Sequence, residues 1–118
     1  MRIENQREIL EIEHSDISGS HCHDVNLSGT KLSDVNMSRV EINQANLAGA
    51  VIDDATMPGA SFHNMDMSGA SFSEVNLTHV IIEKANLAGL MIRHCKLDGM
   101  YIDGVAVADL LAAYRDKH

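Results

Sequence analysis

Apolar residues recur at every fifth position through most of the chain, without a break from Leu10 to Val107. One series, named the centres here, runs from Ile12 in steps of five and contains no charged residue. A second series, the minor sites, lies two residues before each centre and holds only small or apolar side chains. In Ala45-Asn46-Leu47-Ala48-Gly49, for example, the first residue is a minor site and the third a centre.

A five-residue period fits neither a helix nor a flat strand. Successive centres would be rotated by about 140° on an α-helix, and they would alternate between the two faces of a strand. Both series point inward only if the chain bends once in every five residues, and four bends close a square coil of about twenty residues. The pattern therefore predicts an all-β solenoid of nearly five coils, stacked at about 4.8 Å per coil.

Glycines mark the corners of the predicted coils. Gly lies two residues after a centre at positions 19, 29, 49, 59, 69, 89 and 99, where it supplies the positive φ angle of a type II turn. Pro58 and Gly59 occupy the two central positions of such a turn. Arg39 and His79 stand where the pattern would place glycine, so we expect a different turn type at those two corners.

The two ends depart from the repeat and divide a single domain, residues 1–118, into three parts. Residues 1–9 form an N-terminal cap, as a strand or an irregular segment, and residues 10–107 carry the repeats. Residues 108–118 form a C-terminal helix and tail, because the apolar residues there have the i, i+3, i+4, i+7 spacing of an amphipathic helix. This helix covers the open end of its own last coil, or it also pairs with a second chain.

The repeat resembles that of the pentapeptide-repeat family, whose motif is Ala-(Asp/Asn)-Leu-x-x. Ala45-Asn46-Leu47 and Ala85-Asn86-Leu87 match it outright, and Val25-Asn26-Leu27 matches with an allowed replacement. The resemblance covers about residues 10–107. It implies a right-handed, quadrilateral β-helix, here of about five coils with twenty residues in each and a short C-terminal α-helix.

Composition restricts the partners and the compartment. The formal charge of −8 repels phosphates, which disfavours direct nucleic-acid binding; it suits a basic protein partner, or it serves solubility alone. Because there is no apolar run of transmembrane length and no signal peptide, we expect no membrane association and a cytoplasmic location. Cys22 and Cys95 fall more than three coils apart, too far for a disulfide, and are expected to be reduced, buried thiols.

Four acidic residues gather on the predicted surface. Asp34, Asp54 and Glu74 lie twenty residues apart and therefore stack in one column, and Asp53 lies in the neighbouring column. We name this set the acidic face. It is either an anionic stripe offered to a basic partner or a solvated face that nearby histidine and arginine side chains soften.

The family resemblance implies one specific role for such a face. Quinolone-resistance members of the family look like DNA, as acidic rods of about duplex width that bind a type II topoisomerase. This sequence shares the repeat and the charge, but it has fewer coils per chain and no loop insertions between residues 10 and 107. An acidic DNA mimic that binds a DNA-binding enzyme is therefore the alternative function.

The sequence offers no catalytic, cofactor or metal site. In His21-Cys22-His23 the cysteine is a centre and points inward while the histidines point outward, so the three residues do not face one ion. Nucleophile-elbow, nucleotide-loop and His-Glu-x-x-His motifs are absent, which argues against an enzyme. The recurring Asn and Asp residues just before centres are expected to satisfy backbone groups at turns.

Outward positions become apolar late in the chain. A cluster of exposed apolar residues beside an amphipathic tail predicts an interface. It forms a homodimer contact at the C-terminal end, or these residues pack under the chain's own tail. The candidate residues are Ile81, Met91, Tyr101, Leu110, Leu111 and Tyr114. The leading hypothesis for function is a non-catalytic scaffold that uses its rigid faces to bind an unknown protein partner.

Overall fold

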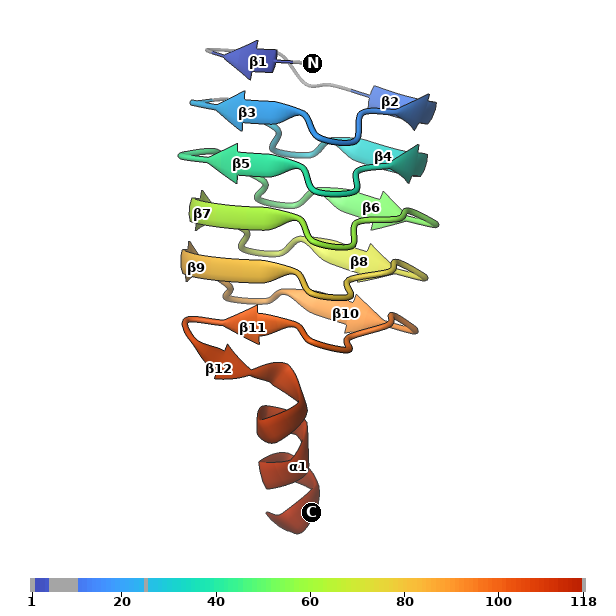
Figure 1. The fold of residues 1–118 in the computed structure, drawn as a ribbon. Coiled ribbons are helices and arrows are strands. Elements are labelled where there is room, and N and C mark those ends of the chain that lie inside the picture. The colour runs from blue at the N-terminus through green and yellow to red at the C-terminus, as the bar shows by residue number, and fades with distance from the viewer. Residues whose placement is uncertain (1, 5–10, 25, 118) are drawn as a thin grey trace.

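The computed structural model describes residues 2–4, 11–24 and 26–117, which form a right-handed, four-sided β-solenoid ending in one helix (Figure 1). Parallel partners lie twenty residues apart, as in Glu11↔Lys31 and Lys31↔Val51. Four such steps lead from the first to the last strand of one sheet, so four full coils and part of a fifth are present, slightly fewer than expected. The molecule is a rod of 43 × 24 × 20 Å.

Two parallel sheets form opposite sides of the rod (Figure 1). The other two sides are held by isolated bridges such as Asn26↔Asn46 and Asn36↔Thr56. Sheet A contains, in order, β1 (Arg2–Glu4), β3 (His21–His23), β5 (Glu41–Asn43), β7 (Ser61–Asp66), β9 (Ile81–Asn86), β11 (Tyr101–Ile102) and β12 (Val105–Ala106). Sheet B contains β10 (Met91–Arg93), β8 (Ser71–Ser73), β6 (Val51–Asp53), β4 (Lys31–Asn36) and β2 (Glu11–Asp16).

The centres and minor sites of the middle coils fill one continuous core along the rod axis. Phe62 and Phe72 are the largest of the buried side chains, and they face inward from sheets A and B of the same coil. Ile42 and Ile52 occupy the equivalent places one coil earlier. The predicted inward direction of both series is therefore confirmed in these coils.

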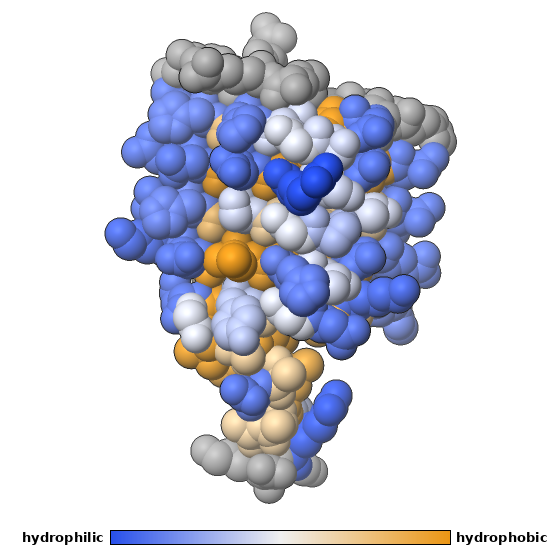
Figure 2. Space-filling view, in the orientation of Figure 1, coloured by the Kyte–Doolittle hydropathy of each residue, from blue (hydrophilic) through white to orange (hydrophobic). Residues whose placement is uncertain are grey.

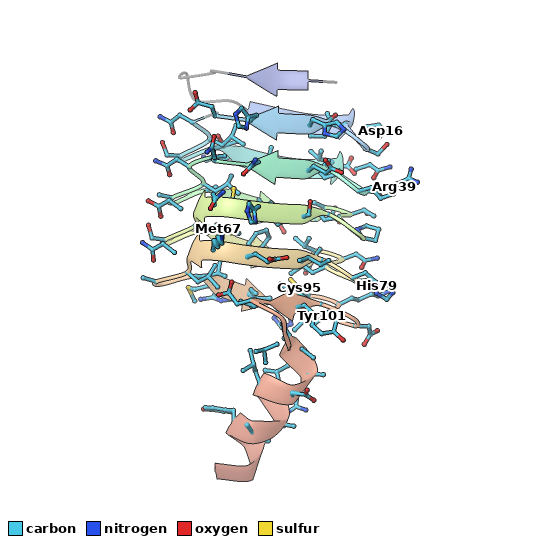
Figure 3. The ribbon with its side chains drawn as sticks, turned by 60° about the vertical axis from the view of Figure 1, so that its left-hand side comes forward. Asp16, Arg39, Met67, His79, Cys95 and Tyr101 are labelled. Carbon is cyan, nitrogen blue, oxygen red and sulfur yellow. The ribbon has the colours of Figure 1, made fainter. Side chains whose placement is uncertain are left out.

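The prediction of a different turn type at Arg39 and His79 was wrong. Both residues adopt positive φ angles, 57° and 60°, like the glycines at the other corners of their kind. Their turns are closed by the same bond, in which the amide of the next residue donates to the centre carbonyl, as from Val40 to Met37 at 3.1 Å. The left-handed conformation costs a non-glycine residue roughly 1–2 kcal/mol, and the ladder bonds of adjacent coils offset it. Arg39 N donates to Pro58 O at 2.9 Å. The Arg39 side chain points away from the rod at this corner (Figure 3).

The predicted turn role of the recurring Asn and Asp side chains is confirmed. Asn46 Oδ1 accepts the amide of Ala48 at 2.8 Å, and the same contact recurs at Asn26, Asn36, Asp66, Asn76 and Asn86. Thr56 interrupts this series where the residue two further on is Pro58, which has no N–H to be satisfied.

The N-terminal cap begins as a strand. β1 adds to sheet A with a register of nineteen residues, Arg2↔His21, so it continues the stack without belonging to the repeat. The rest of the predicted cap, residues 5–9, and the first minor site, Leu10, lie outside the described residues, as does Val25.

The C-terminal repeat ends earlier than its sequence period. After Gly104 (φ 78°) the chain reverses, and β12 pairs antiparallel with β11 through Ile102↔Val105. Val105, which the period assigns to an inward minor site, is therefore 44% exposed. Helix α1 follows as Val107–Lys117, about three turns, as the spacing of its apolar residues predicted.

Candidate functional site

The acidic face lies along one corner of the rod. Asp34, Asp54 and Glu74 are exposed and occupy successive corners with φ angles of 52°, 54° and 55°, and Asp53 is exposed on β6. The structure thus brings the four predicted residues together. It also supplies a second reason for the residue types, because Asp is among the few non-glycine residues that tolerate the left-handed region.

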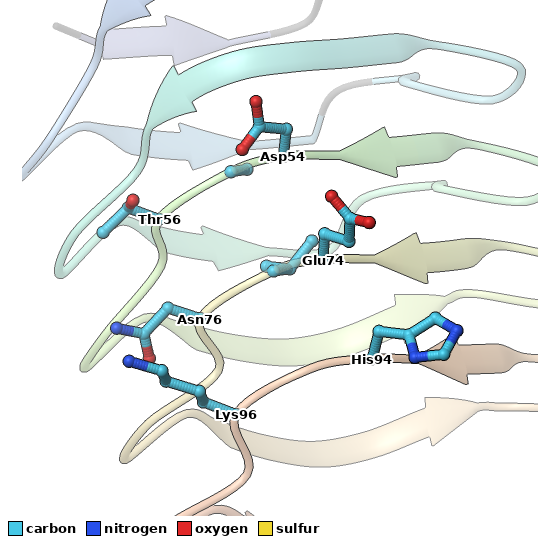
Figure 4. Close-up of a pocket in the computed structure, with 8 residues that line it drawn as sticks. Asp54, Thr56, Glu74, Asn76, His94 and Lys96 are labelled. Carbon is cyan, nitrogen blue, oxygen red and sulfur yellow. The ribbon is translucent and has the colours of Figure 1, made fainter.

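A shallow groove of about 340 Å³ runs beside the lower part of this corner (Figure 4). Asp54 and Glu74 line one part of it, and His94 and Lys96 line the part nearest the last coil. Its remaining lining comes from Ala55, Thr56, Val75 and Asn76. The groove therefore offers both signs of charge, and its lining includes no serine or cysteine nucleophile.

The net negative charge is confined to the N-terminal two thirds of the chain. Residues 1–80 contain twelve acidic and four basic side chains, whereas residues 81–118 contain five of each. The whole formal charge of −8 therefore belongs to the first part, and the last coil with α1 is neutral. A neutral end associates with a copy of itself without the repulsion that the acidic body would impose.

The core is open at the C-terminal end. Leu87, Leu90 and Leu97 are only partly buried, whereas Met67, one coil above the first of them, is fully buried. Ala85, Ile92, Cys95 and Ile102 share this partly buried state. The open end is therefore lined by side chains of the core type. An open last coil was expected, but periodicity assigns every centre the same environment and could not say which side chains would be left partly exposed.

Backbone groups are also unpaired at this end. In the coil above, the amides of Glu74 and Leu77 donate to the carbonyls of Arg93 and Lys96 at 3.1 and 2.8 Å. The equivalent donors of the last coil, such as the Leu97 amide, find no such acceptor among the described residues. β10 is likewise an open edge of sheet B, a surface on which strands associate.

Helix α1 does not cover this opening. Val107 is buried at its start, but the helix then leads away from the coils (Figure 1). Leu110, Leu111 and Tyr114 are 47%, 37% and 61% exposed. A pocket of about 250 Å³ separates Leu97, Asp98 and Gly99 from Ala108, Leu111 and Arg115. The apolar stripe of the helix is therefore still accessible to a second chain.

The six predicted interface residues do not form one surface. Ile81 and Tyr101 pair as neighbours on sheet A, whereas Met91 projects from sheet B on the opposite side. The other three lie on α1. All six are exposed, as expected, and Met91 is the one that the structure places on the other sheet from Ile81 and Tyr101.

Chemistry beyond surface charge is sparse. No cluster of three or more His, Cys, Asp or Glu side chains suited to a metal exists among the described residues. His21 Nδ1 instead contacts Glu41 Oε2 at 3.0 Å on the exposed surface. Both cysteines are free, as expected; Cys22 is buried, which raises its pKa, and Cys95 is only partly buried, contrary to expectation. Within the described part of the chain, no helix combines the length and apolarity needed to span a membrane.

Comparison with protein families gives one match. The family model described as Pentapeptide repeats matches eight copies, in overlapping segments 13–44, 20–59, 36–73, 45–83 and 70–105. A search of curated proteins found no match.

Solved structures similar to this chain include three pentapeptide-repeat or resistance proteins. HetL, involved in heterocyst differentiation regulation in Nostoc sp. strain PCC 7120, is 21% identical over 85% of this chain and 51% of its own, with a TM-score of 0.43. The chain thus spans about half the length of HetL. Rfr23 from Cyanothece 51142 is 16% identical over 86% of this chain and 88% of its own, with a TM-score of 0.40. QnrB1, a plasmid-mediated fluoroquinolone resistance protein, is 16% identical over 98% of this chain and 96% of its own, with a TM-score of 0.28.

Proposed function

The chain belongs to the pentapeptide-repeat family, and we propose that it is a non-catalytic scaffold that dimerises at its C-terminal end and presents its rigid faces to a protein partner. The observation that carries this proposal is the contrast between a sealed core in the middle coils and an open core in the last one. A fold that seals its core elsewhere leaves this end exposed at a cost in free energy, which a second copy removes.

Three features of the end favour a second copy as its occupant. Leu110, Leu111 and Tyr114 present an exposed apolar helix stripe, and Leu111 lines one pocket with the partly buried Leu97. The segment from residue 81 onward is neutral, so two copies meet without net repulsion. The edge of β10 and the unpaired amides of the last coil offer hydrogen bonds that a two-fold partner satisfies.

The oligomeric state tests the proposal. Light scattering after size exclusion is expected to give twice the chain mass of 12.9 kDa for the wild type. Leu111→Arg places a charge in the apolar stripe and is expected to give a monomer with an unchanged circular dichroism spectrum. Val51→Arg, at an exposed apolar residue of sheet B far from the end, is the matched control and should remain dimeric. A wild type that is monomeric at 100 micromolar refutes the dimer.

An acidic DNA mimic is the second candidate, supported by the confinement of all net negative charge to residues 1–80. Dimerisation through neutral ends would join two acidic bodies into a longer rod. The test is a gyrase supercoiling assay with the protein in a concentration series. Inhibition or protection that weakens with salt, and that fails in a variant neutralised at Asp53, Asp54 and Glu74, supports mimicry. No effect at micromolar protein rejects it.

We propose that the binding partner is cytoplasmic, a compartment in which free cysteines such as Cys22 and Cys95 remain reduced. Affinity capture from cytosol of the source organism, at low and moderate salt, separates the two candidates. A partner retained at moderate salt favours the scaffold, because apolar contacts resist screening. A DNA-binding enzyme retained only at low salt favours the mimic.

A further inference from the structure

The repeat provides an internal comparison for every outward position, and one column of sheet A breaks its own pattern. The residue just before each centre on this sheet is His21, Glu41 and Ser61 in the first three coils and Ile81 and Tyr101 in the last two. All five occupy the same place in the ladder. Because the first three coils form with polar residues at this position, the apolar side chains of Ile81 and Tyr101 are not needed to form a coil.

Ile81 and Tyr101 continue into a smaller apolar residue on β12. Tyr101 pairs with Ile81 on β9 and with Ala106 on β12, so the three side chains share the outward face of sheet A, whereas Val105 pairs with the inward-facing Ile102. Ile81 and Tyr101 are 42% and 44% exposed, and Ala106 is partly buried. Figure 2 shows apolar surface over the lower strands of this side of the rod, beneath a polar upper half. We name this surface the β9–β12 patch.

The exposed apolar residues of sheet B differ from this patch. Val51 stands between Lys31 and Ser71 in its column, so it is isolated. Met91 is close to the Arg93 guanidinium, which donates to its sulfur at 3.5 Å. Sheet B therefore carries single apolar residues of equal exposure that need no partner, and they serve as controls.

Carboxylates flank the β9–β12 patch. Glu83 and Asp103 follow Ile81 and Tyr101 by two residues and are exposed beside them. Asp103 is held in place because its Oδ1 accepts the amide of Lys84 at 2.9 Å. In the corresponding position of sheet B the last coil has Arg93 instead. The tyrosine hydroxyl makes no hydrogen bond within the described part of the chain, so the patch combines apolar anchors, a free polar group and fixed negative charge.

We infer that the β9–β12 patch docks a basic amphipathic segment of the partner protein. Apolar side chains of the segment pack on Ile81, Tyr101 and Ala106, and its Lys or Arg residues pair with Glu83 and Asp103. Tyrosine surrounded by smaller apolar contacts is the residue type that dominates binding energy in protein interfaces. The inference rests on the proposed scaffold function, and it assigns the lateral face to the partner and the coil end to the second copy.

A displayed library of random twelve-residue peptides tests this site without knowledge of the partner. The full chain is the bait, and selection is repeated with the double variant Ile81→Ser, Tyr101→Ser and with the sheet B control Val51→Ser, Met91→Ser. We expect peptides enriched by the wild type and the control, but not by the sheet A variant, to carry at least two Lys or Arg residues among apolar ones. Binding of one synthetic peptide should weaken about tenfold or more in the sheet A variant and less than about twofold in the control.

Each outcome of this selection decides the inference. Three results overturn the patch as a docking site. The enriched peptides are neutral or acidic, both double variants lose the enrichment equally, or the wild type enriches no peptides above an unrelated bait. Light scattering of the sheet A variant separates this failure from failure of the scaffold proposal. If that variant is monomeric while the control is dimeric, the patch belongs to the dimer contact and the inference is wrong, whereas dimerisation itself stands.

Discussion

Thr30 carries a buried hydroxyl whose removal should stabilise the protein. The residue is a minor site with 0% exposure, and its Oγ1 has no hydrogen-bond partner within the described chain. Valine has the same shape and already fills two equivalent minor sites, Val40 and Val80, where it is fully buried. Thr30→Val therefore replaces an unsatisfied polar group with a methyl group and leaves the coil geometry unchanged.

The magnitude follows from complete burial. An unpaired hydroxyl in a protein interior costs about 1–3 kcal/mol, and a buried methyl group adds about 0.8 kcal/mol in favour of folding. Residual burial in the unfolded chain lowers the sum, so we expect a gain of about 1–2 kcal/mol in the free energy of unfolding. For a chain of this length, that corresponds to roughly 3–10 °C in Tm.

Urea unfolding followed by circular dichroism measures this change, at one fixed protein concentration because dimerisation would shift the midpoint. Thr56→Val is the control, since Thr56 is exposed and its substitution should change the free energy by less than about 0.5 kcal/mol. Thr30→Ala separates the two contributions, because it removes the hydroxyl but leaves a small cavity. A Thr30→Val variant that is no more stable than the wild type refutes the conclusion that this hydroxyl is unsatisfied.

Three further changes test other parts of the structure. Gly99→Ala should destabilise the protein by at least about 1 kcal/mol more than Gly19→Ala in the same urea assay. Both glycines have positive φ, but only at Gly99 would an added Cβ approach the His79 imidazole nitrogen, to 2.3 Å. Equal losses of stability would show that the imidazole moves away freely. A thiol reagent should modify Cys95 much faster than Cys22, since Cys22 is buried and its pKa is raised; equal rates in single-cysteine variants would contradict the described core. Asp66 accepts side-chain and backbone hydrogen bonds from Ser68, which lower its pKa below 3.8. It should therefore contribute stability that is present above that pH and lost as the pH falls through its folded pKa. Asp66→Asn should flatten this part of the plot of unfolding free energy against pH, and an unchanged plot would count against the carboxylate's role.

The sequence predicted the core and the turns because both depend on local chemistry that repeats. Leu47 and its equivalents recur at a fixed interval, so their common inward direction is the only arrangement that buries them all. Likewise, Asn46 reaches an amide only two residues away, and no tertiary information is needed to place that contact. The acidic face could be predicted for the same reason, since residues separated by one coil length must stack.

The parts that sequence did not predict depend on neighbouring coils or on where the stack stops. Arg39 was assigned another turn type because the intrinsic preference of arginine disfavours positive φ, but ladder bonds above and below impose it. Val105 keeps the period and yet is exposed, because Gly104 reverses the chain before it and Val105 then pairs with Ile102 at the open end of the stack. Leu97 has the sequence environment of any centre, and only the absence of a further coil leaves it partly exposed.

Asp103 makes the length of this protein adjustable in fixed steps. In earlier coils a corner amide finds a backbone carbonyl of the next coil, as Gln44 N finds His63 O at 3.0 Å, whereas the Lys84 amide ends the series on the Asp103 carboxylate. A duplication of any twenty residues upstream would leave that termination intact and lengthen the rod by about 4.8 Å. The distance from the C-terminal end of the rod to any face upstream of the duplication would therefore change in steps of one coil, while the residues at both places stay the same.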